Sequence, residues 1–447
     1  MKKGMFFALA ASSLLFSACS SDDAVVSTEG QNEAVQQIVL QVASSGDGLS
    51  TRAGRPLYSS EALQTIQHVR VLIYNTKTNA IVKDEQLDWT KSDKYDNHGR
   101  QHTLTYKGND RLEGGSYKVM AVGYSDNSDY TYALDVTGAS LTGKTYSDIT
   151  ATLKDGKKDA EEVFAGDAAL TIGDDKKITN LTNGEENGVA VTLHRQVAGS
   201  FGYFCNIPAK VGGKTAKTLR LVVRDKNDVL TFNNFNSSFT TTGSTIKYYV
   251  NGSTSTGAPL ATTDKFSNGD NGYVLYSIDL SKWFTEGDKN KDGLLNAEDT
   301  WQRPDNVKTQ VVKGSVFGSN FVIPFKYTEG KSTMELQLLD ADGNIIKHWT
   351  VSIPESDLNK VAANGVTDAD ASIFNVVRNH MYNLGVKTST GTTTTPDPSN
   401  PTPDPKPDPK PTPDPGKDEP EDLTKSQNLI LKVNDNWEVI HKLVLGD

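Results

Sequence analysis

Residues Met334 to Ile353 read MELQLLDADGNIIKHWTVSI, the clearest β-hairpin signal in the chain. Apolar residues recur on both sides of Asp340 to Asn344, a run of Asp, Asn and Gly that favours a tight turn. The pattern predicts two antiparallel strands joined at Asp342 and Gly343.

Similar short runs of alternating or β-branched residues recur outward from this hairpin, while helical periodicity is scarce. Examples are Val69 to Tyr74, Tyr117 to Tyr124 and Leu219 to Val223. The sequence therefore predicts an all-β protein. Its 447 residues are enough for about two domains, and we expect β-sandwiches over residues 53–187 and 188–391, with a boundary near Gly188.

The first residues have the layout of a secretory signal. Lys2 and Lys3 precede an apolar run from Met5 to Phe16, and Cys19 follows small residues. This predicts a lipoprotein signal over residues 1–18 and acylation of Cys19; an uncleaved membrane anchor is the alternative. The formal net charge of −10 argues against nucleic acid as a partner.

Only two cysteines are present, so a lipidated Cys19 leaves Cys205 without an internal disulfide partner. Cys205 lies in the apolar stretch Phe201 to Ile207 and is interpreted as a small buried hydrophobe. No nucleophile, metalloprotease or phosphate-binding motif is present, so we expect no enzyme activity. The near pair His98 and His102 has no metal-site pattern.

Residues 19–52 are predicted to be a propeptide with a removable strand. Ile38, Leu40 and Val42 alternate on one face of that strand. The pair Arg52 and Ala53 follows a flexible polar stretch and suits a trypsin-like protease, although an incidental arginine in a linker is the alternative. Cutting there would free the strand and expose a sheet edge or groove that another chain could fill.

The composition changes near residue 392, where a Thr/Pro-rich linker is predicted to run to residue 425. Its Pro396 to Pro420 part cannot bury a core, so it is either a semi-rigid polyproline spacer or a disordered stalk. Residues 426–447 then return to an apolar alternation. A lone strand must pair with a sheet in its own subunit or in another, which predicts a donor strand built on Leu429, Leu431, Val433, Trp437, Val439, Leu443 and Leu445.

Residues 288–299 match a calcium-binding loop of EF-hand type up to its last position. The predicted ligands are oxygen atoms of Asp288, Asn290, Asp292, Leu294, Asn296 and Asp299. Aspartate stands where glutamate is usual, which predicts weak binding, and an Asp/Asn-rich turn without metal is the alternative. The other large aromatic candidates, Trp89, Trp283, Trp301 and Trp349, are interpreted as sandwich packing rather than sugar platforms.

The order of these features resembles the FimA/Mfa-type fimbrillins of Bacteroidales, above all their Mfa-type minor-fimbria subunits. The resemblance rests on Cys19, the Arg52–Ala53 site, Trp437 and two further segments, Leu193 to Ala198 and Arg378 to Tyr382. It implies transthyretin-like Greek-key sandwiches, arginine-specific maturation outside the outer membrane, and assembly by exchange of the C-terminal strand into the groove left by the propeptide strand.

We therefore expect a stalk subunit of an adhesive surface fimbria, made as an outer-membrane lipoprotein. Its expected partners are other copies of itself, accessory fimbrial subunits, a maturation protease, and host or bacterial surface receptors. The alternative is a lipid-anchored monomer that binds glycans or host proteins.

Overall fold

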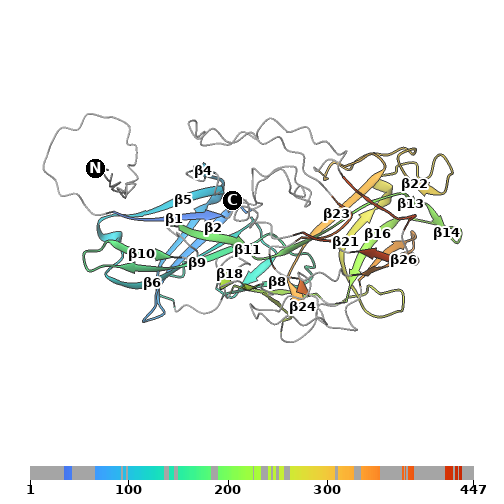
Figure 1. Ribbon diagram of the computed structural model, residues 1–447. Helices are drawn as coiled ribbons and strands as arrows, with labels where there is room; N and C mark the ends of the chain where they lie inside the picture. Colours follow the sequence, from blue (N-terminus) through green and yellow to red (C-terminus); the bar gives the residue numbers. More distant parts are fainter. Residues whose placement is uncertain are drawn as a thin grey trace, which may run out of the picture.

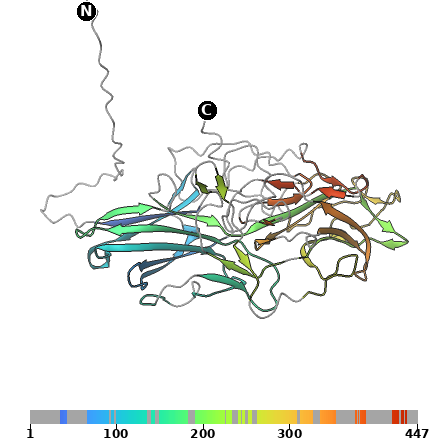
Figure 2. The ribbon, with the colours of Figure 1, turned by 60° about the horizontal axis from the view of Figure 1, so that its bottom comes forward.

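The computed structural model describes residues 35–42, 66–91, 94–96, 99–134, 140–144, 149–182, 190–224, 226–232, 240–242, 245–247, 251–255, 262–307, 311–326, 334–352, 375–376, 378, 381–386, 418–425, 428–430 and 432–434. These residues form strands and short 3₁₀ helices without an α-helix. They make two units along one long axis, an N-terminal unit coloured blue to green and a C-terminal unit coloured green to red (Figures 1 and 2). The all-β prediction is confirmed.

The N-terminal unit is built on a nine-stranded sheet in which β10 adds to β9. Its strands, in sheet order, are β3 (Ile81–Asp88), β2 (His68–Asn75), β6 (Gly115–Tyr124), β9 (Phe164–Ile172), β11 (Ala190–Arg195), β1 (Gln36–Val42), β5 (Gly99–Tyr106) and β4 (Lys94–Asp96), with β10 (Ile178–Thr182). Strand β11 turns from one layer into the next: its first residues pair with β1 and its last two with β9.

A second, four-stranded sheet covers the outer face of β2 and β6. It contains β20 (Gly252–Ser253), β17 (Val229–Thr231), β8 (Thr150–Leu153) and β7 (Tyr130–Tyr132). Alternate residues of β2 therefore face two different cores. Val69, Val71 and Ile73 pack toward β1 and β5, whereas Leu72 and Tyr74 pack toward β7, β8 and β17. The N-terminal unit is thus a stack of three sheet layers.

The C-terminal unit is a sandwich of two five-stranded sheets around one core. One sheet contains β23 (Ser315–Val322), β12 (Ala198–Cys205), β28 (Met381–Leu384), β31 (Lys432–Asn434) and, beside β12, β29 (Glu421–Asp422). The other contains β21 (Tyr273–Asp279), β16 (Thr218–Val223), β25 (Met334–Leu339), β26 (Ile345–Ser352) and β30 (Asn428–Ile430).

Short elements complete the described structure. The two-stranded pairs are β13 (Ile207–Pro208) with β22 (Leu294–Leu295), β14 (Lys210–Val211) with β15 (Lys214–Thr215), β18 (Thr240–Thr242) with β19 (Thr245–Lys247), and β24 (Phe325–Lys326) with β27 (Asn375–Val376). The 3₁₀ helices are η1 (Trp89–Lys91), η2 (Gly108–Asp110) and η3 (Leu280–Lys282).

The hairpin predicted from residues Met334 to Ile353 is confirmed as β25 and β26. Gly343 has a φ of +81°, a value that glycine adopts at little cost. The carboxylate of Asp340 accepts hydrogen bonds from the backbone N–H groups of Asp342 and Asn344, at 3.0 and 2.8 Å. Local turn chemistry therefore fixes the register of this pair of strands.

The structure moves the predicted unit boundary from Gly188 to the link between β11 and β12. Strand β11 follows Gly188 but belongs to the N-terminal unit, because its alternate residues Val191 and Leu193 fill the core beside β1. Leu230 of β17 also packs into the N-terminal unit, although it comes from the second half of the chain. Alternation alone could not assign these strands to a unit.

Candidate functional site

Strand β1 lies inside a sheet, although it comes from the segment predicted to be a removable propeptide. It pairs in parallel with β11, with Val39 opposite Ala190, and antiparallel with β5, with Ile38 opposite Leu104. Ile38 and Leu40 are fully buried in the core of the N-terminal unit. Removing β1 would thus open a groove between β5 and β11, which we call the β1 groove.

A buried glutamine holds the start of β1 in place. The side-chain amide of Gln36 donates to the carbonyl oxygens of Leu112, at 2.9 Å, and Lys176, at 2.8 Å. Its carbonyl oxygen accepts from the N–H of Leu112 at 2.8 Å. Lys176 holds the left-handed conformation, with a φ of +59°. We call these backbone groups of Leu112 and Lys176 the Gln36 socket.

The predicted lipidation and processing residues lie outside the described residues. These residues are Cys19, Arg52 and Ala53. Lipidation upstream of β1 and cleavage downstream of it therefore remain predictions from the sequence. Val42, the third residue of the predicted apolar face, closes β1 opposite Leu193.

The described part of the predicted donor segment pairs with its own C-terminal unit. Strand β30 runs parallel to β26, and β31 runs antiparallel to β28. Leu429 is fully buried, and Val433 pairs with Tyr382. Both strands lie at the edges of their sheets, so the segment closes the sandwich without separating two other strands. The remaining predicted donor residues, Leu431, Trp437, Val439, Leu443 and Leu445, lie outside the described residues.

The structure shortens the predicted linker, because residues 418–425 belong to the C-terminal sandwich. Val386 and Glu419 form an antiparallel bridge with N–H···O distances of 2.7 and 2.9 Å. Leu423 is buried in the core, and Asp418 accepts a hydrogen bond from the hydroxyl of Tyr203 at 3.1 Å. The Pro-rich segment therefore leaves and re-enters the unit at one point, and does not space the terminal segment away from it.

A second anchor precedes the terminal segment. Strand β29 pairs with the end of β12, and Asp422 accepts hydrogen bonds from Asn206, at 2.9 Å, and from the Thr424 hydroxyl, at 2.7 Å. Burial tends to raise the pKa of Asp422, but these hydrogen bonds outweigh it and lower the value to about 2. The carboxylate is therefore charged at all physiological pH values.

The described residues include the whole of the predicted calcium loop, residues 288–299. Gly293 has a φ of +89°, and its N–H donates to one carboxylate oxygen of Asp288 at 3.0 Å. The other oxygen of Asp288 is buried without a hydrogen-bond partner. Asp299 is buried and accepts from the N–H groups of Lys289 and Asn296, at 2.9 and 3.0 Å. One free buried carboxylate oxygen is compatible with a cation.

The remaining predicted ligands lie in the same loop. Asp292 accepts from the N–H of Leu294 at 2.8 Å and from the side-chain amides of Asn290 and Asn296 at 3.0 and 2.7 Å. Among the described residues, however, no three His, Cys, Asp or Glu side chains converge as metal ligands. The loop is docked on the C-terminal unit through β22, so a cation there would stiffen a long connection.

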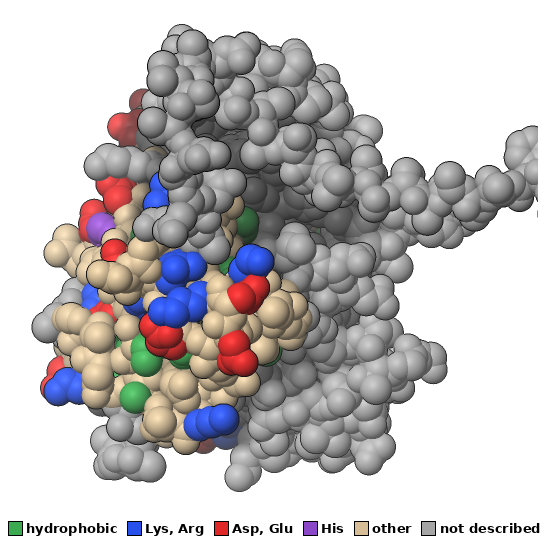
Figure 3. All heavy atoms as spheres, turned by 90° about the vertical axis from the view of Figure 1, so that its left-hand side faces the viewer, with side chains coloured by type: hydrophobic (Ala, Val, Ile, Leu, Met, Phe, Trp, Pro, Cys, Tyr) green, Lys and Arg blue, Asp and Glu red, His purple; other side chains and the backbone are tan. Residues whose placement is uncertain are grey.

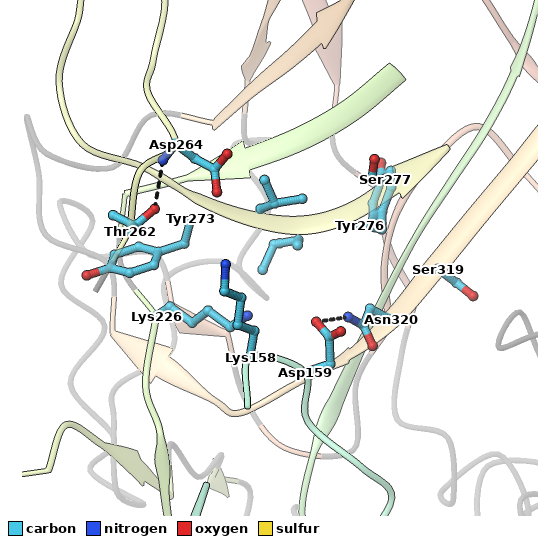
Figure 4. A pocket seen from close by; sticks show the side chains of 12 residues that line it. Lys158, Asp159, Lys226, Thr262, Asp264, Tyr273, Tyr276, Ser277, Ser319 and Asn320 are labelled. Carbon is cyan, nitrogen blue, oxygen red and sulfur yellow. Dashed lines mark hydrogen bonds between the residues drawn. The ribbon is translucent and has the colours of Figure 1, made fainter. Parts of the chain in front are cut away.

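One pocket of about 500 Å³ lies outside the strand-exchange features (Figure 4). Lys158 and Lys226 line it together with Asp159, which accepts from the amide of Asn320 at 2.8 Å, and Asp264, which pairs with Arg220 at 2.6 Å. Burial lowers the pKa of Lys226 against the opposing charge of Asp159. The pocket is therefore polar, with two aspartates opposite its two lysines.

On the far end of the N-terminal unit, basic and acidic side chains are interspersed with few hydrophobic ones (Figure 3). No helix in the described part of the chain is long and apolar enough to cross a membrane. Cys205 is half-buried in β12, and burial raises its pKa to about 11. The thiol is thus protonated and a poor nucleophile at neutral pH.

Sequence reasoning missed the polar cluster between the two units. Gln196, fully buried, accepts a hydrogen bond from Arg378 at 2.9 Å, and Arg195 pairs with buried Glu162 at 2.7 Å. The segments Leu193 to Ala198 and Arg378 to Tyr382 thus meet here, although they are distant in the sequence. Polar residues inside apolar strands were the available signal. Trp89, Trp283 and Trp349 are buried as predicted, and Trp301 donates to the carbonyl of Ser315 at 2.7 Å.

No protein-family model and no curated protein matches the sequence. Solved structures similar to the chain include the tip fimbrial protein Mfa3 of Porphyromonas gingivalis, with C-terminal truncation (10% identity, TM-score 0.35, 79% of this chain and 94% of that one). A fimbrial assembly protein of Parabacteroides distasonis (14%, 0.35, 80% and 92%) and the P. gingivalis fimbrial anchor protein Mfa2 (9%, 0.31, 78% and 90%) are further examples. TM-scores below 0.5 do not establish a common fold.

Proposed function

We propose that the protein is a structural subunit, of the stalk type, of an adhesive fimbria on the cell surface. In this proposal the precursor is acylated at Cys19 and reaches the outer membrane as a lipoprotein. An arginine-specific protease cuts between Arg52 and Ala53, β1 leaves, and the C-terminal segment of another copy fills the β1 groove. We also propose that the two units have the topology of transthyretin-like Greek-key sandwiches.

The observation that carries this proposal is the position of β1. A segment that precedes the predicted cut supplies an internal strand with two fully buried aliphatic side chains. Burying each of these contributes about 1.5–3 kcal/mol, and both neighbouring strands lose backbone partners when β1 leaves. An empty groove is therefore unstable in water, and a strand from another chain is a chemically suitable replacement.

The second supporting feature is the place of the terminal segment. It lies at two sheet edges in its own unit, so it can detach without opening the middle of either sheet. A strand that is internal at one end of the chain and a strand that is peripheral at the other end are the two components that head-to-tail polymerisation needs.

The experiment compares processing and polymerisation in surface extracts. Material from the wild-type chain should begin at Ala53 and give a ladder of polymers on unboiled denaturing gels. Arg52→Ala should keep the upstream segment and abolish the ladder. Arg55→Ala is the matched control, because Arg55 precedes Pro56 and suits such a protease poorly. A ladder of normal length from Arg52→Ala would disprove the proposal.

The expected partners follow from this assembly. They are further copies of the chain, accessory fimbrial subunits, the maturation protease, and host or bacterial receptors at the surface.

A chain that stops after Lys425 keeps β29 and Leu423 but lacks the donor segment. It should therefore accept a strand from another copy and end the polymer.

We further propose that Ca²⁺ binds weakly to the loop of residues 288–299 and stabilises it. The support is the buried, unpartnered oxygen of Asp288 together with the left-handed turn at Gly293. Calorimetric titration at millimolar Ca²⁺ should give heat for the mature chain and none for Asp288→Asn. Asp342→Asn, in the β25–β26 turn, is the control and should bind normally. No uptake by the unaltered chain would exclude the ion.

The alternative function, a lipid-anchored monomer that binds glycans or host proteins, has one feature in its favour. The pocket beside Lys158 and Lys226 is large enough for a small anionic saccharide. Binding of a uronic-acid oligosaccharide that is lost in Lys226→Gln, with an uncut Arg52 bond and no polymers, would favour this alternative.

A further inference from the structure

The inference concerns which residues of a second copy enter the β1 groove, and in which register. It rests on the proposed strand exchange. Strand β1 reads QQIVLQV from Gln36 to Val42, and residues 427–433 read QNLILKV. Gln, Leu and Val recur at the first, fifth and seventh positions, and aliphatic residues stand at the third and fourth positions of both segments.

The buried face of β1 makes this likeness specific. The groove takes Gln36, Ile38 and Leu40 on its inner side, all at most 1% exposed. In the same register, residues 427, 429 and 431 supply glutamine, leucine and leucine. Gln37 and Val39, on the other face, are more exposed, and the donor has Asn428 and Ile430 there.

The Gln36 socket distinguishes this register from the others that the C-terminal segment offers. It presents two carbonyl oxygens and one N–H to a single side chain. A primary amide alone supplies two donors and an acceptor at once. Placing Trp437 and Val439 at the inner aliphatic positions would bring Asp435 to the socket, and a carboxylate has no N–H to donate. Placing Leu443 and Leu445 there would bring His441, whose ring cannot make all three bonds.

We infer that residues Gln427 to Val433 of a second copy replace β1 residue for residue, with Gln427 in the Gln36 socket. In this register Ile430 lies opposite Thr103 of β5 and Ala190 of β11, as Val39 does in the precursor. Gln427 is thus a specificity-determining residue of the donor.

The same segment has a weaker place in its own subunit. There, β30 pairs on one side with β26 and β31 on one side with β28. In the β1 groove the middle of the strand is paired on both sides, as Val39 to Gln41 are. The propeptide strand blocks the better site until it is removed. Leu423 stays in the core of the donor subunit. Residues 424–426 then connect it to Gln427 in the groove of the acceptor.

Register is tested by disulfide trapping between a donor variant and an acceptor variant that can form one junction only. The donor carries Arg52→Ala, so its own groove stays closed. The acceptor ends after Lys425 and is cut by an arginine-specific protease. Both lack Cys19 and Cys205 through serine substitutions. Directly opposed residues have Cα atoms about 4.5–5.5 Å apart, within the range that a disulfide spans.

Ile430→Cys in the donor and Thr103→Cys in the acceptor should give a disulfide-linked heterodimer. Asn428→Cys and Lys432→Cys should fail with Thr103→Cys, because a shift of two residues moves the Cα atoms beyond reach. The pair Asn428→Cys and Thr105→Cys should trap again. Trapping of Glu438→Cys or Val444→Cys with Thr103→Cys, and not of Ile430→Cys, would overturn the register while leaving strand exchange intact.

The absence of any heterodimer, trapped or untrapped, would instead reject the proposed function. The role of Gln427 has its own readout. Gln427→Ala should speed dissociation of the untrapped heterodimer by about ten- to a hundredfold, because the socket loses its partners. Gln427→Glu should behave similarly, since it lacks the two donors, and Ser426→Ala should leave the rate unchanged. An unchanged rate for Gln427→Ala would remove Gln427 from the socket.

Discussion

Leu40→Ala should destabilise the precursor and have no effect on the finished polymer. Leu40 is fully buried in the core that β1 shares with β5 and β11. Truncation of such a leucine costs about 2–5 kcal/mol, which includes the cavity that remains. This cost corresponds to a roughly thirty- to several-thousandfold increase in the population of the open groove. In the proposed maturation, cleavage after Arg52 removes β1, so the mature subunit no longer contains residue 40.

Hydrogen exchange of the β5 amides measures this effect where it occurs. In the uncut precursor, exchange in the part of β5 that pairs with β1, Gln101 to Tyr106, should accelerate by the stated factor, because opening of the groove exposes amides there. Gln37→Ala, on the exposed face of the same strand, is the control and should change the rate little. Polymers grown from the Leu40→Ala precursor should match wild-type polymers in exchange. Acceleration below tenfold in the precursor, or a defect that persists in the polymer, would refute the role assigned to β1.

Because burial raises the pKa of Cys205 to about 11, iodoacetamide should modify it slowly at pH 8 and fast only in unfolded protein; fast labelling of the folded chain would contradict this. The pKa of Asp422 lies at about 2, below its unfolded value. The charged carboxylate should therefore stabilise the C-terminal anchor fully above pH 4, and this stabilisation should be lost as the pH falls toward 2. The measurement is the unfolding free energy of the wild type and of Asp422→Asn as a function of pH. Arg195→Ala should lower the unfolding free energy by about 3–5 kcal/mol, because it removes the positive charge that pairs with buried Glu162. A loss below 1 kcal/mol by urea titration would show that the pair is not needed.

The strands were predictable wherever local pattern and turn chemistry agree, as in β2, β6, β16 and the β25–β26 hairpin. Strand β1 was also predictable, because Ile38 and Leu40 alternate in an otherwise polar segment. Its partners were not, since pairing with β5 and β11 joins residues far apart in the sequence. No local property of Leu112 or Lys176 indicates that their backbone groups receive Gln36.

The unit boundary and the linker were misplaced for two physical reasons. Strand β11 pairs with β1 in one layer and with β9 in the next. The alternation of apolar and polar residues along one strand does not reveal such a change of partner. Residues 418–425 are polar and adjoin the prolines, so composition assigned them to the linker. Yet the buried side chain of Leu423 and the bridge at Glu419 fasten them to the sandwich. Tertiary pairing outweighed composition in both places.

The bridge between Val386 and Glu419 holds the two ends of the Pro-rich insertion next to each other. In the proposed fibre, a longer or shorter insertion would leave the spacing between successive subunits unchanged, because this bridge, and not the insertion, fixes the distance between β28 and β29. In that assembly, the sequence and length of the insertion can change without altering how successive subunits join.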